Sequence, residues 1–219
     1  MKTIHAVLLM SDESGARLCQ LANAAGISLK AEVVSDLPAL ARAFDASPEL
    51  LLSFGTSVIV PESLLELPGL LALNVHAASP DYPGRDTHHF AVYDGVTEYG
   101  ATLHFMTSKV DAGPIIDVEL FGVPADTRPA RLLELANQAA WTLLGRLLEK
   151  LAGEKTLVPL GGISWGVRKT TRKMFLELCR VDVSMTEIEF ARRLKATSMP
   201  GYNNLFFELH GHRFRLEGK

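Results

Sequence analysis

Two polar residues end an apolar run in the first half of the chain. The apolar residues 71–73 are followed by Asn74, Val75 and His76. If this run is a β-strand, Asn74 and His76 point to one side of it and Val75 to the other, because side chains alternate along a strand. Side by side, an amide can hold a negatively charged oxygen and an imidazole can move a proton. Taken alone, such a pair is more often structural, with its hydrogen bonds satisfied inside the protein.

A carboxylate comes from a second segment. Asp111 lies within residues 107–114, a loop with Gly and Pro at its end that separates two predicted strands. If this loop reached the end of the first strand, Asp111 could accept a proton beside the amide and the imidazole. His104 lies in the strand before the loop and is interpreted as a structural or supporting residue.

These residues belong to a larger pattern that resembles the folate-dependent formyltransferases. That family includes glycinamide ribonucleotide transformylase, methionyl-tRNA formyltransferase and bacterial sugar N-formyltransferases. The resemblance spans roughly residues 54–152 and keeps the order and spacing of the family's motifs, which makes it specific. The matching segments are Asn74-x-His76, Tyr82-Pro83-Gly84, Gly100-x-Thr102-x-His104 and Val110-Asp111-x-Gly113-Pro114-Ile115-Ile116.

The resemblance implies a catalytic role for each polar residue. Asn74 would hold the formyl carbonyl and its oxyanion, and His76 would orient the formyl oxygen and assist proton movement. Asp111 would act, directly or through water, as the general base for the attacking amine. Formyl transfer builds negative charge on the carbonyl oxygen and releases a proton from the amine, so this division of roles is chemically consistent. With Asp111 present, we favour the functional interpretation of the Asn74–His76 pair.

The resemblance also implies the formyl donor, 10-formyltetrahydrofolate, and no metal. The adjacent His88 and His89 resemble a metal-binding pair, but neighbouring side chains are expected to diverge. The family's folate lies in a cleft with apolar walls and loop backbone. Carried over by position, the cofactor-binding residues are Phe54, Gly55, Thr56, Ser57, Val58, Ile59, Leu73, Thr107 and Val110.

The acceptor amine is predicted from three features of the chain. Asp12 and Glu13 stand where the purine-forming transformylases bind phosphate, and two carboxylates there would repel it. The formal net charge of −3 disfavours a large nucleic-acid surface, and with it tRNA. The tail from Trp165 onward resembles that of bacterial formyltransferases that act on nucleotide-linked amino sugars. The predicted substrate-binding residues are Tyr82, Gly84, Arg85, Trp165, Arg168 and Lys173.

Other functions remain open at this point. The acceptor could be another small amine, such as glycinamide ribonucleotide or a hydroxylated ornithine, or methionyl-tRNA. The same residues could hydrolyse the formyl-folate, or the protein could be a folate-binding module without catalysis. The basic residues of the tail could be a solvated loop, and Trp165 could pack in the core.

The elements that must position these residues follow from periodicity. Short apolar runs alternate with helical patterns through the first half, which is typical of parallel βαβ units. The predicted strands are 3–10, 29–34, 49–54, 70–75, 99–107 and 115–123, and the predicted helices are 14–25, 37–45, 61–67, 88–94, 127–152 and 185–196. We therefore expect an α/β fold: an open, mostly parallel twisted sheet flanked by helices, a Rossmann-like formyltransferase fold.

The end of the chain has a different character. A helix and a β-hairpin, with strands 205–209 and 212–216, form a small C-terminal appendage. We predict a catalytic domain over residues 1–157 and an extension over 158–219. The hairpin would expose Phe206 or Phe207 on one face and could make a homodimer contact. The short apolar N-terminal run reads as a first strand and not as a signal peptide or membrane span, so we expect a cytoplasmic enzyme.

Overall fold

A six-stranded sheet forms the centre of the protein. The computed structural model describes residues 1–216. The sheet has the order β2-β1-β3-β4-β5-β6; β1 to β4 are parallel, while β5 and β6 are antiparallel to their neighbours. The predicted α/β class with a mostly parallel sheet is confirmed. The strands are β1 (Lys2–Leu9), β2 (Ile27–Val34), β3 (Leu50–Phe54), β4 (Leu71–His76), β5 (Glu98–Phe105) and β6 (Ile115–Gly122).

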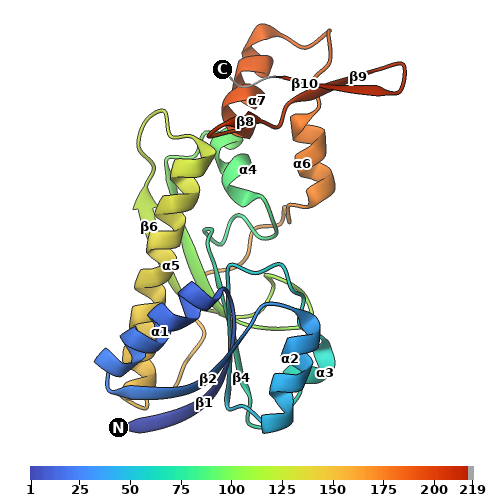
Figure 1. The fold of residues 1–219 in the computed structure, drawn as a ribbon. Helices are drawn as coiled ribbons and strands as arrows, with labels where there is room; N and C mark the ends of the chain where they lie inside the picture. Colours follow the sequence, from blue (N-terminus) through green and yellow to red (C-terminus); the bar gives the residue numbers. More distant parts are fainter. Residues whose placement is uncertain (217–219) are drawn as a thin grey trace.

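Helices cover both faces of this sheet. Figure 1 shows α1 and α5 on one face and α2 and α3 on the other. The buried side chains agree, because α1 and α5 pack with β1, β3 and β4 in one cluster, and α2 packs against the opposite face of β1 and β3 in another. The helices are α1 (Asp12–Ala24), α2 (Leu37–Ala43), α3 (Glu62–Leu65), α4 (Thr87–Asp94), α5 (Pro129–Ala152), α6 (Arg172–Cys179) and α7 (Glu187–Thr197), with a 3-10 turn η1 (Phe44–Ala46).

Local sequence signals explain where the longest helices begin. Ser11 caps α1 by accepting a hydrogen bond from the Ser14 N–H, so the helix begins at Asp12, two residues before the predicted start. Pro129 occupies the first turn of α5, where its missing N–H costs nothing, and the helix therefore begins two residues after the predicted start. One face of α5 is apolar and buried, from Leu132 to Leu148, so α5 supports the sheet along its length.

The C-terminal elements gather at one end of the molecule, around α4 and the N-terminal end of α5 (Figure 1). They include α6, which was not among the predicted helices. Thr171 caps α6 by accepting from the Met174 N–H, and only Phe175, Leu178 and Cys179 of the helix are buried. The helix spans only eight residues, about two turns, which is too short for a periodic apolar pattern to be recognised in the sequence. The remaining strands are β7 (Ser198–Met199), β8 (Tyr202–Asn203), β9 (Phe206–Leu209) and β10 (His212–Arg215).

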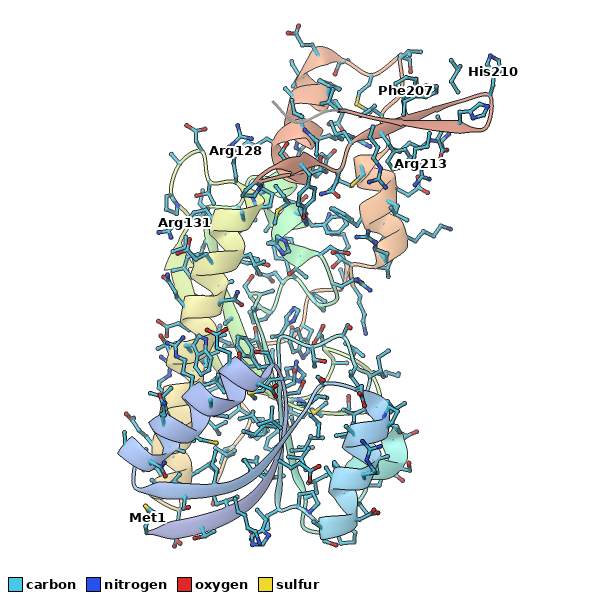
Figure 2. All side chains as sticks on the ribbon, viewed as in Figure 1. Met1, Arg128, Arg131, Phe207, His210 and Arg213 are labelled. Atoms are coloured by element: carbon cyan, nitrogen blue, oxygen red, sulfur yellow. The ribbon has the colours of Figure 1, made fainter. Side chains whose placement is uncertain are left out.

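The predicted hairpin is confirmed as the antiparallel pair β9 and β10. Figure 2 shows Phe207, His210 and Arg213 on an arm that projects from the body. Phe206 is buried, whereas Phe207 is 40% exposed and stacks on Phe214. Of the two residues that the sequence offered, Phe207 is therefore the exposed one. The homodimer contact of the hairpin stays a prediction.

Within residues 1–216, no helix combines the length and the apolar character needed to cross a membrane.

The predicted boundary after residue 157 stays a prediction. The extension contacts the sheet directly, because the Leu160 N–H donates to the Ile115 carbonyl over 2.7 Å.

Candidate active site

Asn74 lies half-buried in β4 and is held by the neighbouring strand. Because β4 and β5 are antiparallel, Asn74 is directly opposite His104, and the Asn74 amide nitrogen lies 3.0 Å from His104 Nε2. His104 Nδ1 lies 2.8 Å from the Phe105 carbonyl, an acceptor, so Nδ1 carries a proton. With the proton on Nδ1, the Nε2 lone pair can accept one amide proton of Asn74. The second amide proton of Asn74 is left to donate to another oxygen.

His76, at the end of β4, has both ring nitrogens engaged. Nε2 donates to the Tyr82 carbonyl over 2.9 Å, and Nδ1 faces Asp111 Oδ2 at 3.8 Å. The ring is half-buried and lies edge-on to the indole of Trp165, with 5.9 Å between ring centroids. The hydrogen bond to Tyr82 fixes the ring in one orientation, with one edge toward a backbone carbonyl and the other toward a carboxylate.

Asp111 reaches both histidines from the loop between β5 and β6. Its side chain is buried, with Oδ2 near His76 and Oδ1 3.6 Å from His104 Nε2. The Gly84 N–H donates to Oδ2 over 2.9 Å. Burial alone would raise the pKa of Asp111. The neighbouring imidazole groups of His104 and His76 and the Gly84 N–H outweigh burial, so the pKa of Asp111 lies below the ordinary value. Asp111 is therefore a buried carboxylate at neutral pH.

The three predicted catalytic residues thus come together, with His104 as a fourth member. From the sequence, His104 was interpreted only as a structural or supporting residue. Its direct contacts with Asn74 and Asp111 depend on the antiparallel register of β4 and β5, which pairs residues 30 positions apart. The alternation Gly100-x-Thr102-x-His104 is the signal that could have placed it on the same side of the sheet as Asn74.

Of the predicted substrate-binding residues, Tyr82, Gly84 and Trp165 contact this centre, whereas Arg85, Arg168 and Lys173 do not. Tyr82 is buried, and its hydroxyl donates to Asp94, which also binds Arg168. Arg85 pairs with Asp86 at the surface. Gly84 contacts Asp111, as described above. Trp165 lies against the histidines, with its ring edge-on to His104 at 4.9 Å, and Lys173 is exposed on α6.

The predicted folate-binding residues divide into buried and exposed groups. Phe54 and Leu73 are 6% and 0% exposed and belong to the main core, where Phe54 packs edge-on against Trp141. Ile59 and Val110 are 67% and 42% exposed and present apolar side chains from two loops. The others are Gly55, Thr56, Ser57, Val58 and Thr107, of which Thr56 and Val58 are half-buried and the rest exposed.

The histidine pair of α4 differs from the expectation that its side chains diverge. The His88 and His89 rings lie 4.3 Å apart and tilted, and His89 Nδ1 donates to the Ala196 carbonyl of α7 over 2.7 Å. Burial lowers the pKa of both rings, that of His88 to about 3. The pair therefore stays neutral and joins α4 to the C-terminal helices. In residues 1–216, no three His, Cys, Asp or Glu side chains form a group that could hold a metal ion.

Solved structures of formyltransferase-type proteins have the same fold as this chain. A sugar N-formyltransferase from Shewanella sp. FDAARGOS_354 superposes with a TM-score of 0.70 at 18% identity, over 100% of this chain and 98% of that one. HypX from Aquifex aeolicus in complex with tetrahydrofolic acid superposes with a TM-score of 0.69 at 19% identity, over 98% of this chain and 37% of that one. At these identities the likeness establishes the fold alone.

Sequence comparison adds the family. A methionyl-tRNA formyltransferase from Enterococcus faecalis is 32% identical over 133 residues, which are 60% of this chain and 42% of that protein. The matched region thus spans less than half the length of the curated relatives. Residues 5–143, more than half of the chain, match the formyl transferase family and contain Asn74, His76 and Asp111. The chain is therefore a member of the formyl transferase family.

Proposed function

We propose that this protein transfers a formyl group from 10-formyltetrahydrofolate to the amine of a nucleotide-linked amino sugar. The observation that carries the proposal is the convergence of Asn74, His76 and Asp111, with His104, in a chain of this family. This set offers an oxyanion donor and a proton acceptor, the two requirements of transfer to an amine.

The donor set suits a formyl-folate. When bound, the folate supplies a carbonyl carbon that an amine can attack. The second amide proton of Asn74 can donate to the formyl oxygen, on which negative charge builds. His76 can offer Nε2 to the same oxygen by exchanging its 2.9 Å hydrogen bond to the Tyr82 carbonyl. Both donors are neutral or cationic, as this position requires.

Asp111 is suited to receive the proton that the amine loses as its nitrogen bonds to the formyl carbon. The depressed pKa keeps Asp111 ionised near neutral pH, although it also makes the carboxylate a weaker base. The His76 Nδ1 at 3.8 Å and a water are two routes by which the proton can reach it. We infer that Asp111 also holds His76 in orientation and balances its charge.

Three observations support an amino sugar as the acceptor. The Shewanella protein named as a sugar N-formyltransferase matches the whole described fold, including the C-terminal elements. Arg85, next to the Gly84 that binds Asp111, and Lys173 of α6 are both exposed, and either could meet a diphosphate. The net charge of −3 disfavours tRNA. Methionyl-tRNA is the second candidate, because curated sequence relatives carry that name.

The test is turnover with a panel of amines. Purified protein is mixed with 10-formyltetrahydrofolate and a nucleotide-linked amino sugar, a free amino sugar, methionyl-tRNA, glycinamide ribonucleotide or hydroxyornithine. Absorbance follows release of tetrahydrofolate, and mass spectrometry detects the formylated product. We expect product with a nucleotide-linked amino sugar and loss of turnover in Asn74→Ala.

Two other results would replace the proposal. Release of formate without any acceptor identifies a formyl-folate hydrolase. Tight folate binding with no product from any amine, and unchanged binding in Asn74→Ala, identifies a binding module. Preferred turnover of another acceptor corrects the substrate and retains the chemistry.

A further inference from the structure

A stretch of the C-terminal extension lies across the loops that hold the catalytic residues. Residues 165–170 run alongside residues 80–85, which follow β4. The Gly166 N–H donates to the Pro80 carbonyl and the Thr170 N–H to the Pro83 carbonyl, both over 2.9 Å. The approach is close, because a Cβ on Gly166 would lie 2.3 Å from the Asp81 carbonyl oxygen. The two stretches are thus joined backbone to backbone.

The same stretch binds the Asp111 loop on both sides of the carboxylate. The Trp165 indole N–H donates to the Gly113 carbonyl over 2.8 Å. The Lys169 ammonium donates to the Val110 carbonyl. One donor therefore acts on the residue before Asp111 and the other on the second residue after it, and both come from outside the catalytic segments.

Thr170 connects this stretch to the Asp111 carboxylate itself. It is 2% exposed, and its hydroxyl lies 2.8 Å from the Arg85 carbonyl while its own carbonyl accepts from the Arg85 N–H over 3.2 Å. Thr170 thus binds Pro83 and Arg85, the residues before and after Gly84. The Gly84 N–H donates to Asp111 Oδ2. The position of that N–H thus depends on Thr170.

The Asp111 backbone needs such support. Its φ is +46°, in the left-handed region that L-residues with a side chain rarely adopt. Conformations of this kind persist only where the surroundings determine them from several sides. Trp165 and Lys169 supply two of those constraints by binding the neighbouring carbonyls. Trp165 also lies edge-on to His76 and His104, the two rings that face the carboxylate.

We propose that residues 165–170 form a clamp, in which Trp165, Lys169 and Thr170 are positioning residues that fix Asp111 between His76 and His104. The clamp's role in turnover rests on the proposed formyl transfer. Its effect on the Asp111 carboxylate can be measured without any substrate. Trp165 thereby acts on the loop and the histidines, and not through a nucleotide base.

The test combines single donor deletions with a matched control. Trp165→Phe keeps an aromatic ring and removes the N–H, and Lys169→Met keeps the length of the side chain and removes the ammonium group. Lys195→Met is the control, because Lys195 lies in α7 and pairs with Asp126 at 3.5 Å, outside the clamp. Carboxyl 13C NMR follows the titration of Asp111, whose signal is assigned by its absence in Asp111→Asn.

We expect the apparent pKa of Asp111 to rise in Trp165→Phe and Lys169→Met and to stay unchanged in Lys195→Met. The reason is that a loosened loop loses the contacts with His104, His76 and the Gly84 N–H, which together hold that pKa down against burial. In the active enzyme, we expect kcat to fall at least tenfold in each clamp variant, with the KM for the amine within twofold. Denaturant melts identify any variant that fails to fold. If one of the two clamp variants does not fold, the Asp111 titration of the other one tests the proposal.

The proposal is overturned if both clamp variants are folded and keep the wild-type Asp111 titration. An equal shift in Lys195→Met also overturns it, because the effect would then not come from the clamp. A shifted titration in a protein with no formyl-transfer activity supports the clamp and refutes the proposed function, so the two failures are distinguishable.

Discussion

Gly84 is the position where a single methyl group should disturb the site most directly. Its φ is +107°, and a Cβ there would lie 2.1 Å from the Thr170 carbonyl oxygen and 2.8 Å from the Thr170 nitrogen. Ordinary contact begins near 3.4 Å, so in Gly84→Ala the two backbones must separate by about 1.3 Å at the closest pair. The Gly84 N–H donates to Asp111 over 2.9 Å, and a shift of that size would break the bond.

The expected magnitude follows from two losses. An L-residue in the left-handed region costs about 1–2 kcal/mol, and a hydrogen bond to a charged group contributes roughly 1.5–3 kcal/mol. We therefore expect Gly84→Ala to lower the free energy of unfolding by roughly 2.5–5 kcal/mol. If the hydrogen bond to Asp111 is needed in the transition state, kcat falls about 10- to 150-fold.

The matched control is Gly95→Ala. Gly95 also has a positive φ, +71°, but nothing lies within 4 Å of the place that a Cβ would take there, so only the conformational cost of about 1–2 kcal/mol applies. Urea denaturation gives the stability of both variants, and the formyl-transfer assay gives kcat. The reasoning is refuted if Gly84→Ala is no less stable than Gly95→Ala, or if both keep wild-type kcat.

Three further predictions follow from the same structure. Asp111→Asn should lower kcat about 10²- to 10⁴-fold by removing the proton acceptor; a kcat within tenfold of wild type contradicts the role of Asp111. In the folded protein the pKa values of His88 and His89 lie below the ordinary 6.5, so below pH 6.5 the unfolded chain binds more protons than the folded protein. The free energy of unfolding is therefore highest above pH 6.5 and declines toward about pH 3. The decline is at most roughly 1.4 kcal/mol per pH unit for each histidine. Urea melts across this range should show a smaller decline in His88→Gln, and an equal decline would be inconsistent with the assignment. Thr171→Ala should lower the free energy of unfolding by about 1 kcal/mol, because it removes the N-cap of α6. Unchanged urea melts would show that the cap does not contribute to stability.

The sheet, and the placement of Asn74 and His76 on one side of a strand, could be predicted because their signals are local. The strand β3 is a continuous run of buried residues, and β4 ends in two polar side chains two positions apart. The alternation that places Asn74 and His76 together is a property of the backbone and does not depend on the rest of the fold. Asp111 was assigned through the family's motif, and the structure places it where that motif implies.

What could not be predicted depends on contacts between distant residues. The His104–Asn74 pair requires the register of an antiparallel strand pair, and the Trp165–Gly113 hydrogen bond joins residues 52 positions apart. The positive φ of Asp111 could not be predicted, because most Asp residues adopt negative φ although Asp enters the left-handed region more often than most residues do. Helix α6 is only eight residues long, about two turns, which is too short for helical periodicity to distinguish it from a loop.

Each predicted catalytic residue is held by a residue of another segment, and these contacts have a consequence for the predicted domain boundary. Asn74 is held by His104, Asp111 by Gly84, and Gly84 by its close approach to Thr170. The last support therefore lies beyond residue 157, in the predicted extension. A domain boundary after residue 157 would therefore not divide the protein into a self-sufficient site and an independent extension, because Thr170 of the extension contacts the Gly84 that binds Asp111. Because Trp165 and Lys169 bind the carbonyls on both sides of Asp111, we expect the Asp111 loop to keep its geometry only in a chain that includes residues 165–170.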